Sequence, residues 1–442
     1  MRCRDWLLLL ALPRAGSLAQ RADRAAVVKL YHLLNGPWWH RNANWDVDKG
    51  DPCAYAHDHN LQEPWDGIHC LDPCSLHIDG LECYSGRITV IHLERNNLTG
   101  SITNWTEVGA LTNLTTLNLR ENHISGTLPG EIGGIMNLVD IDFSRNKLQG
   151  TIPTEIGTLN ANGGRMYPGG QYTPEWGGYK MSSADLEDKR PPRILNFDLS
   201  HNELEGTLPT QMGKVNTELL ALHDNRISGT LPQQFANLTW LQHWDMRNNR
   251  IGGSLPTEIQ KLRELRFLDL SDNRLSGPIP PGIVELDELE DLQLSTNNLT
   301  GDLPPELGKL TSLVYLRLYN NALTANLSRH GSIGELEQLE VLDLYNNSMV
   351  GDMPPQFANL KSLKYLYLQN EHYWPLRHFY CRQRLPKATW GKGGTKYNWV
   401  VVAQMYETMT TSTVQGDRRC IDPHDTTFAF NSLQDSGVLA MG

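Results

Sequence analysis

Cysteine and histidine side chains gather near the start of the chain, where they could ligate a metal ion or form disulfides. The segment holds four of each, namely Cys53, Cys70, Cys74, Cys83, His57, His59, His69 and His77. Zinc sites use close pairs such as Cys-x-x-Cys, and this segment has no such pair or other standard zinc spacing. Disulfides are therefore the favoured chemistry, with metal binding as the alternative, and we expect neither a metal nor a cofactor.

Motifs for catalysis are missing from the chain. It has no Gly-x-Ser-x-Gly nucleophile turn, no His-Glu-x-x-His pair and no Gly-x-x-x-x-Gly-Lys phosphate loop. Scattered carboxylates are not evidence of an active site. We therefore expect a binding protein rather than an enzyme.

Residues 1–19 resemble a secretory signal peptide, because Arg2 and Arg4 precede an apolar run and small residues lead to Ala19. Six of the seven cysteines follow this segment, four before residue 84 and two, Cys381 and Cys420, after residue 380. That placement suits disulfides that staple the two ends in an oxidising compartment, and the first four cysteines permit three pairings. Asn-x-Ser/Thr glycosylation sequons agree with secretion and occur at Asn97, Asn104, Asn113, Asn237, Asn298, Asn326 and Asn346.

The chain is acidic, with a formal charge of −11. Cleavage after Ala19 would remove three arginines and one aspartate and leave −13. Nucleic acid and anionic membranes attract cationic proteins, so both are poor partners. No run after the signal approaches the roughly 20 apolar residues of a membrane-spanning helix.

A repeat of about 24 residues positions the remaining side chains. It reads Leu-x-x-Leu-x-Leu-x-x-Asn-x-Leu-x-Gly-x-Leu/Ile-Pro and begins at Ile88, Leu114, Leu138, Ile194, Thr217, Leu241, Leu265, Leu289, Leu313, Leu339 and Leu363. The fourth and sixth places alternate and face one side of a short strand. One coil cannot bury that apolar side alone, so stacked coils should build a parallel sheet.

The ninth place is asparagine in ten of the eleven units. Its amide both donates and accepts, so it can satisfy backbone groups where the chain leaves the strand. Glycine at the thirteenth place and the proline after it favour a turn followed by extended or 3₁₀ segments. We expect a buried asparagine ladder made by Asn96, Asn122, Asn146, Asn202, Asn225, Asn249, Asn273, Asn297, Asn321 and Asn347.

Units ending in Gly-Thr-Leu-Pro or Gly-Pro-Ile-Pro resemble plant-type extracellular leucine-rich repeats, those of receptor-kinase ectodomains and polygalacturonase-inhibiting proteins. The resemblance covers roughly residues 88–370, and Asp51-Pro52-Cys53 with Trp65 to Cys70 looks like the N-terminal cap of that class. It implies an α/β solenoid: a right-handed superhelix of about 11 repeats, with a parallel β-sheet on its concave face and disulfide-stapled caps. It also implies a Cys53–Cys70 disulfide, and together with chain proximity favours Cys74–Cys83.

The predicted organisation is a signal peptide (1–19), an N-terminal cap (20–86), the solenoid (87–370) and a C-terminal cap (371–442). The cap should contain a helix over residues 23–34, with Asp23 as its N-cap, and an aromatic plug of Tyr31, Trp38, Trp39 and Trp45. An insertion at 160–193 interrupts the third unit. By resemblance it could help form a ligand pocket, and its Gly and Pro content equally fits a floppy loop.

Ligand binding is expected on the concave face, at the outward places of each strand. At the fifth place, Asp142, Asp198, Asp245 and Asp269 form an acidic stripe suited to a cationic peptide or calcium, although aspartate is also the default filling of this repeat. The last three units place a patch rich in Tyr and Arg, residue types that dominate interface hot spots, on the same face. The candidate ligand-binding residues are Tyr315, Arg317, Tyr319, Asp343, Tyr345, Tyr365, Tyr367, Asp245 and Asp269.

These features predict a secreted recognition protein, receptor-like or inhibitor-like, that binds a protein or peptide ligand, with a co-receptor as a further candidate partner. The alternative is a structural or adhesion protein of the cell wall or extracellular matrix. Retention by bulk polysaccharide would favour the second reading, and one discrete partner would favour the first.

Overall fold

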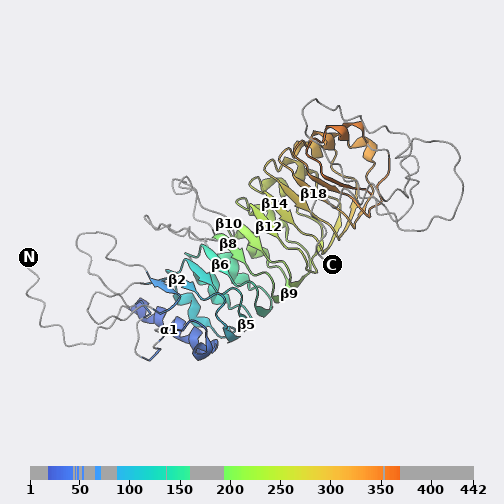
Figure 1. Cartoon of the computed structure of the whole chain (residues 1–442). Coiled ribbons are helices and arrows are strands. Elements are labelled where there is room, and N and C mark those ends of the chain that lie inside the picture. Colours follow the sequence, from blue (N-terminus) through green and yellow to red (C-terminus); the bar gives the residue numbers. More distant parts are fainter. Residues whose placement is uncertain are drawn as a thin grey trace, which may run out of the picture. The chain divides into compact units, whose positions relative to one another are not determined.

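The computed structural model describes residues 18–42, 45, 47–48, 52–53, 65–70, 87–135, 137–159, 194–351 and 354–368. The described chain divides into two compact units that meet in sequence between Ile251 and Gly252. Each unit is a stack of repeat coils with strands on one side and short helices on another (Figure 1). No helix in the described residues is both long enough and apolar enough to cross a membrane.

The first unit is built on a sheet in which consecutive repeats contribute neighbouring strands. The order is β1 (Ile68–Cys70), β2 (Ile88–His92), β4 (Thr116–Asn118), β6 (Asp140–Asp142), β8 (Ile194–Asp198), β10 (Thr217–Ala221) and β12 (His243–Asp245). All these pairs are parallel except β1 with β2, which is antiparallel. The parallel stacking predicted from the period-two apolar pattern is thus present.

The segment 160–193, which lies outside the described residues, does not disturb this sheet. Asp142 in β6 pairs directly with Asp198 in β8, in the register that consecutive repeats use elsewhere. The interruption of 56 residues between units 138 and 194 is therefore one repeat plus an insertion that leaves the sheet continuous.

A second parallel sheet follows the asparagine of each coil. In the first unit it contains β3 (Thr99–Ser101), β5 (His123–Gly126), β7 (Lys147–Gly150), β9 (Glu203–Thr207) and β11 (Arg226–Ser228). The glycine at the thirteenth place of the repeat has a steric cause at Gly206, where φ is +78° and an added Cβ would lie 2.6 Å from the Thr151 methyl group.

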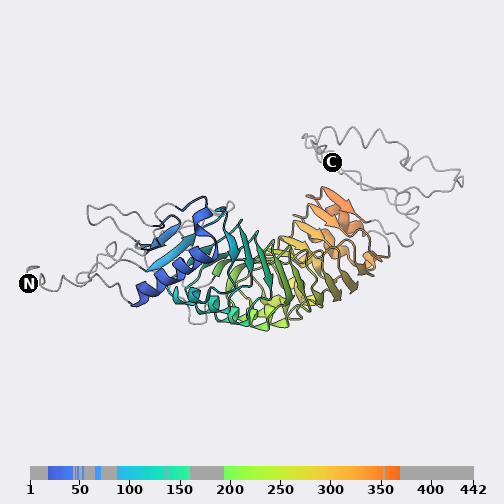
Figure 2. The ribbon, with the colours of Figure 1, turned by 90° about the horizontal axis from the view of Figure 1, so that it is seen from below.

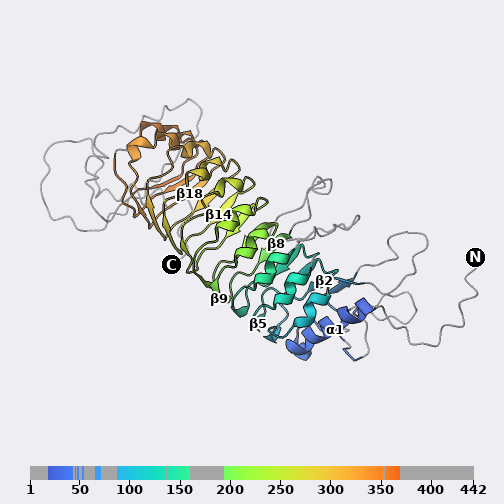
Figure 3. The same ribbon diagram turned by 180° about the vertical axis from the view of Figure 1, so that it is seen from behind.

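Short 3₁₀ helices complete the coils, as the proline pattern predicted. Six of the twelve in the described residues begin directly after a proline, and Figure 3 shows these helices from behind. In the first unit they are η1 (Gly36–Trp38), η2 (Thr106–Ala110), η3 (Gly130–Gly134), η4 (Thr154–Thr158), η6 (Thr210–Lys214) and η7 (Gln233–Asn237).

The second unit repeats the same plan. Its first sheet contains β14 (Phe267–Asp269), β16 (Asp291–Gln293), β18 (Tyr315–Arg317), β20 (Val341–Asp343) and β21 (Tyr365–Tyr367). Its second sheet contains β13 (Gly252–Gly253), β15 (Arg274–Gly277), β17 (Asn298–Gly301) and β19 (Ala322–Leu323). Its 3₁₀ helices are η8 (Ile259–Lys261), η9 (Pro281–Glu285), η10 (Leu307–Lys309), η11 (Leu327–Arg329), η12 (Gly331–Glu335) and η13 (Pro355–Asn359).

The ninth-place asparagines link one coil to the next, and Asn122 illustrates the arrangement. Its Nδ2 donates to the carbonyls of Leu93, Leu119 and Arg120 at 2.9–3.0 Å. Its Oδ1 accepts the N–H groups of Asn96 and Leu98 at 2.9 and 3.0 Å. Equivalent bonds recur at Asn146, Asn202, Asn225, Asn249, Asn297, Asn321 and Asn347.

The helix α1 (Leu18–Leu33) covers the first coil (Figure 2). Its apolar face is buried through Ala26, Val27 and Leu30. Trp105 of the neighbouring coil donates its Nε1 to the Ala26 carbonyl at 2.9 Å. The predicted helix is therefore present, and it hides the core at the open end of the stack.

Two details of this end differ from the sequence prediction. Asp23 is not an N-cap but lies inside α1, 2% exposed, where it pairs with Arg87. Trp38 is 76% exposed and does not belong to the aromatic plug. The cluster instead extends to Trp65, whose ring centroid lies 4.7 Å from that of Trp45.

The cap cysteines are only partly within the described residues. Cys53 and Cys70 form the disulfide that the resemblance implied. Cys74, Cys83, Cys381 and Cys420 lie outside the described residues, as do nearly all of the predicted signal peptide and the whole segment 371–442.

Candidate functional site

The strand face, meaning the solvent side of the first sheet in each unit, carries the predicted site residues. Its fifth-place aspartates turn back to their own backbone. Asp245 Oδ1 accepts the Arg247 N–H at 3.1 Å, and Asp269 Oδ1 accepts the Ser271 N–H at 2.9 Å. Both side chains belong to residues only 3% exposed. These carboxylates therefore brace the end of the strand, a role that competes with ligand binding.

A pair of neighbouring strands brings aspartates together in the first unit. Asp142 lies opposite Asp198, and Asp140 accepts a hydrogen bond from Asn196 at 2.9 Å. Burial raises the pKa of Asp140 to about 6. Burial and then the Asp198 charge raise the pKa of Asp142 to about 7, against the opposing hydrogen bonds of Ser144 and the charge of Arg120.

These raised pKa values predict how stability depends on pH. The folded state keeps protons on Asp140 and Asp142 that the unfolded chain has already released. The contribution of these two groups to the free energy of unfolding is therefore fully present below about pH 4 and is lost as pH rises towards 7. We expect Asp142→Asn to remove about 1–3 kcal/mol of this pH dependence. Urea midpoints measured between acidic and neutral pH test it. Asp272→Asn, at an exposed position, is the control. If the urea midpoint of Asp142→Asn changes with pH as steeply as that of wild type, the assignment is contradicted.

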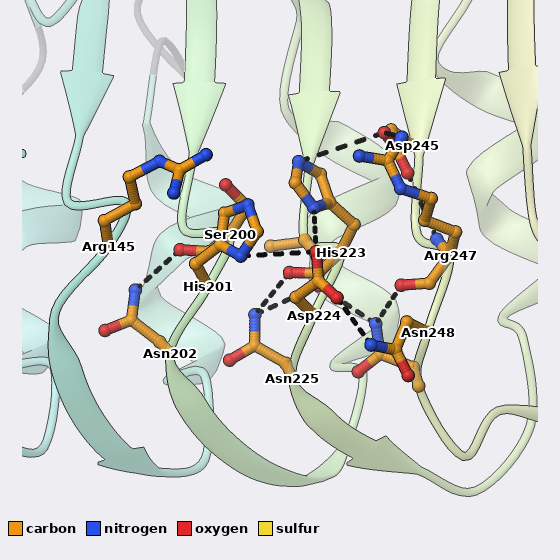
Figure 4. A network of polar contacts seen from close by, with 12 residues as sticks. Arg145, Ser200, His201, Asn202, His223, Asp224, Asn225, Asp245, Arg247 and Asn248 are labelled. Atoms are coloured by element: carbon orange, nitrogen blue, oxygen red, sulfur yellow. Dashed lines mark hydrogen bonds and ion pairs between the residues drawn. The ribbon is translucent and has the colours of Figure 1, made fainter. Parts of the chain in front are cut away.

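A histidine–aspartate network lies just beyond the ends of β8 and β10 (Figure 4). His201 and Asp224 occupy the eighth place of consecutive repeats, and both have left-handed backbones with φ of 51° and 55°. Backbone hydrogen bonding between the two repeats continues past the strands, where the His201 N–H donates to the His223 carbonyl at 2.9 Å. Asp224 Oδ2 then lies 2.8 Å from His223 Nδ1 and 3.3 Å from His201 Nδ1.

The same network reaches the next strand. Asn248 Nδ2 donates to Asp224 Oδ1 at 2.5 Å, so each carboxylate oxygen has its own partners. His223 Nε2 lies 3.9 Å from Asp245 Oδ2, which also pairs with Arg247 at 2.5 Å. Burial lowers the pKa of His201 from its ordinary value, although the Asp224 charge opposes that shift.

The predicted aromatic patch lies on the strand face of the second unit. Arg317 is at its centre, with Cζ 4.8 Å from the Tyr315 ring centroid and Nη1 3.6 Å from Asp291 Oδ1. Strand pairing places Arg317 beside Asp343, and Asp343 beside Tyr367. Cation–π contact and ion pairing hold the guanidinium in place on the sheet.

The remaining tyrosines surround this centre. Tyr365 is 37% exposed and its ring is parallel to that of Tyr367, with centroids 6.5 Å apart. Partial burial, followed by the charges of Asp272 and Asp343, raises the pKa of Tyr319. Seven residues, none of them fully buried, form what we call the tyrosine–arginine patch. They are Tyr315, Arg317, Tyr319, Asp343, Tyr345, Tyr365 and Tyr367.

The nine predicted ligand residues therefore separate into two groups. Seven share the neighbouring strands β18, β20 and β21 or the turns that follow them. Asp269 lies in β14 of the same unit, and Asp245 lies in the other unit. Sequence reasoning missed His201, His223 and Asp224, and the available signal was histidine at the seventh or eighth place of two consecutive repeats.

The predicted glycosylation sites differ in accessibility. Asn104, Asn237 and Asn298 are exposed, and the other four are half-buried. Asn97 Nδ2 donates to the Trp38 carbonyl at 3.2 Å, and Asn346 Nδ2 donates to Asn320 at 3.1 Å. Because a glycan attaches at Nδ2, the three exposed positions are the better candidates.

Comparison with known proteins matches the repeats directly. A leucine-rich repeat region model matches residues 193–330, and a leucine rich repeat model matches residues 113–135, 137–159 and 338–360. A probable inactive receptor kinase of Arabidopsis thaliana is 36% identical over 123 residues. That match spans 28% of this chain and only 14% of the relative.

Solved structures give the same answer for the fold. The ectodomain of the Arabidopsis thaliana receptor kinase GASSHO1/SCHENGEN3, in complex with CASPARIAN STRIP INTEGRITY FACTOR 2, is 27% identical with a TM-score of 0.62 over 78% of this chain and 35% of that chain. The plant peptide hormone receptor RGFR1, in complex with RGF2, is 26% identical with a TM-score of 0.52 over 65% of this chain and 44% of that chain. The chain is therefore a leucine-rich-repeat solenoid protein that resembles plant receptor-kinase ectodomains.

Proposed function

We propose that the chain is a secreted recognition protein that binds a peptide or protein segment through the tyrosine–arginine patch, and that it is not an enzyme. The observation that carries the proposal is the gathering of five tyrosines and Arg317 on three adjacent strands and the turns that follow them. Tyrosine and arginine dominate the energetics of protein interfaces, and a rigid sheet loses little conformational entropy when it binds.

The electrostatics of the patch favour a ligand with mixed polarity. Arg317 offers several N–H donors, of which its ion pair with Asp291 at 3.6 Å engages only part. Burial raises the pKa of Asp291 to about 6, so this partner is itself partly neutral near that pH. An apolar segment with a carboxylate or carbonyl near Arg317 fits the tyrosine rings and the guanidinium together.

Two similar structures support a peptide as the ligand class, since one is a plant receptor kinase in complex with CASPARIAN STRIP INTEGRITY FACTOR 2 and the other is a plant peptide hormone receptor in complex with RGF2. This chain spans less than half of either, so the carry-over is a proposal. A co-receptor and a cell-surface setting belong to the same proposal.

Replacing Tyr319, Tyr345 and Tyr367 together with Ala should weaken ligand binding at least tenfold, which is about 1.4 kcal/mol. A random-peptide phage library panned on the full chain supplies the probe, and each enriched peptide is measured by isothermal calorimetry. Trp38→Ala is the matched control, because Trp38 is an exposed aromatic residue outside the patch.

Enriched peptides that bind wild type and the Trp38→Ala variant equally, but the triple variant weakly, support the proposal. Peptides that bind all three alike, or a library that yields no binder while bulk cell-wall polysaccharide retains the protein, would favour the structural alternative.

A further inference from the structure

His201, His223 and Asp224 converge on the strand face of the first unit, far along the chain from the tyrosine–arginine patch. Their donor atoms all lie within 4.8 Å of one another, which no other set of three such side chains achieves among the described residues. All three are half-buried, so an ion could reach them from solvent.

The spacing of the donor atoms fits a small tetrahedral ion. Zinc binds nitrogen and oxygen at about 2.0–2.2 Å, which places neighbouring ligands roughly 3.3 Å apart. The His201 Nδ1 to Asp224 Oδ2 distance is 3.3 Å, and the His223 Nδ1 to Asp224 Oδ2 distance is 2.8 Å. An ion between the three atoms therefore requires only small side-chain shifts.

The carboxylate is already oriented for this role. Asn248 donates to Asp224 Oδ1 at 2.5 Å, which turns Oδ2 towards the two imidazoles. The rings meet edge to face, with centroids 4.7 Å apart and an interplanar angle of 85°, so both Nδ1 atoms face the same oxygen. Outer hydrogen bonds of this kind orient metal ligands in proteins.

The backbone also prepares the cluster. The eighth-place residues His201 and Asp224 lie in left-handed turns, with φ of 51° and 55°. The His201 N–H to His223 carbonyl bond, and the Asn202 N–H to Asp224 carbonyl bond of 3.2 Å, fix the two turns side by side. The three donors thus come from a rigid repeat framework.

We propose that His201, His223 and Asp224 bind a divalent transition-metal ion such as Zn²⁺, with a fourth position open to water or to a ligand group. Two imidazoles and one carboxylate suit Zn²⁺, Ni²⁺ or Cu²⁺, whereas Ca²⁺ takes six to eight oxygens. Three protein ligands with one open position is the arrangement of an accessible zinc site rather than a closed structural one.

Titration of the full chain with zinc chloride by isothermal calorimetry tests this site. Wild type should bind one Zn²⁺ at its tightest class of sites, and His201→Gln or His223→Gln should weaken that class at least 100-fold. His123→Gln is the matched control, because His123 is an exposed histidine on the second sheet and should leave the titration unchanged.

Asn248→Ala separates orientation from ligation. Because Asn248 contacts the Asp224 oxygen that faces away from the histidines, its loss should weaken Zn²⁺ binding about 10–100-fold while the metal-free protein stays folded. Circular dichroism checks that each variant folds. If folded His201→Gln and His223→Gln bind Zn²⁺ as wild type does, or if Ca²⁺ is preferred, the site does not exist as proposed.

Discussion

Replacing Asp23 with Ala should lower the free energy of unfolding by about 3–5 kcal/mol, because it leaves the partly buried Arg87 guanidinium without its carboxylate partner. Asp23 is 2% exposed, and its two oxygens accept Arg87 Nε at 2.7 Å and Nη2 at 2.8 Å. One of them also accepts the Ile88 N–H at 3.0 Å, at the start of β2. The residue therefore ties α1 to the first strand of the parallel stack.

Hydrogen exchange of the Ile88 amide measures this loss locally, and urea denaturation measures it for the unit. In a double-mutant cycle, Asp23→Ala with Arg87→Ala should cost less than the two single changes added together. Lys361→Ala is the comparison, because its ion pair with Glu337 at 3.0 Å is exposed on both sides and should leave stability unchanged. Additive effects at Asp23 and Arg87 would mean that the pair does not hold α1.

Asn122→Ala should destabilise the first unit by about 3–4 kcal/mol. The side chain makes five hydrogen bonds to backbone groups of two coils, and Asn122 is 5% exposed. Its removal leaves the buried N–H groups of Asn96 and Leu98 without this acceptor, and each unsatisfied group costs about 1–3 kcal/mol. Water cannot easily replace the side chain inside a packed coil.

Two asparagine variants calibrate this result. Asn273→Ala should cost about 1–3 kcal/mol, because Asn273 is less buried than Asn122. Asn137→Ala should have little effect, since its single bond to the Thr112 carbonyl at 2.7 Å is exposed. Urea midpoints followed by circular dichroism compare the three. Equal midpoints for Asn122→Ala and Asn137→Ala would mean that the asparagine ladder does not stabilise the fold.

The two proposed sites are independent, because they lie in different units and use different chemistry. The tyrosine–arginine patch would recognise a ligand through ring surface and one guanidinium, whereas the histidine cluster would bind an ion. Loss of zinc binding in His201→Gln should therefore leave peptide affinity unchanged. A change in both would contradict this independence.

The repeat period alone determined most of the fold. Leucines alternate in a short segment of each coil, and nearly every coil has an asparagine at the ninth place and a glycine four residues later. Each coil therefore meets the same burial problem. The buried Leu268 and the carbonyl contacts of Asn122 follow from that period, and so does the parallel register between β6 and β8 across a long interruption. Such features are predictable because they repeat.

Other features came from contacts between residues distant in sequence. Asp23 was expected at a helix end, but Arg87 and the Ile88 N–H, more than 60 residues away, hold it inside α1. Asp245 and Asp269 occupy outward places, yet each carboxylate accepts a hydrogen bond from the backbone N–H two residues later in the chain.

The histidine cluster depends on the tertiary structure even more strongly. His201 and His223 are 22 residues apart, and only the stacking of two left-handed turns brings their nitrogens to one oxygen of Asp224. Outward places in a repeat tell which residues lie on the strand face, but side-chain direction and neighbouring charges decide which of them meet. The periodic pattern therefore specified the scaffold, and long-range packing decided the chemistry on its surface.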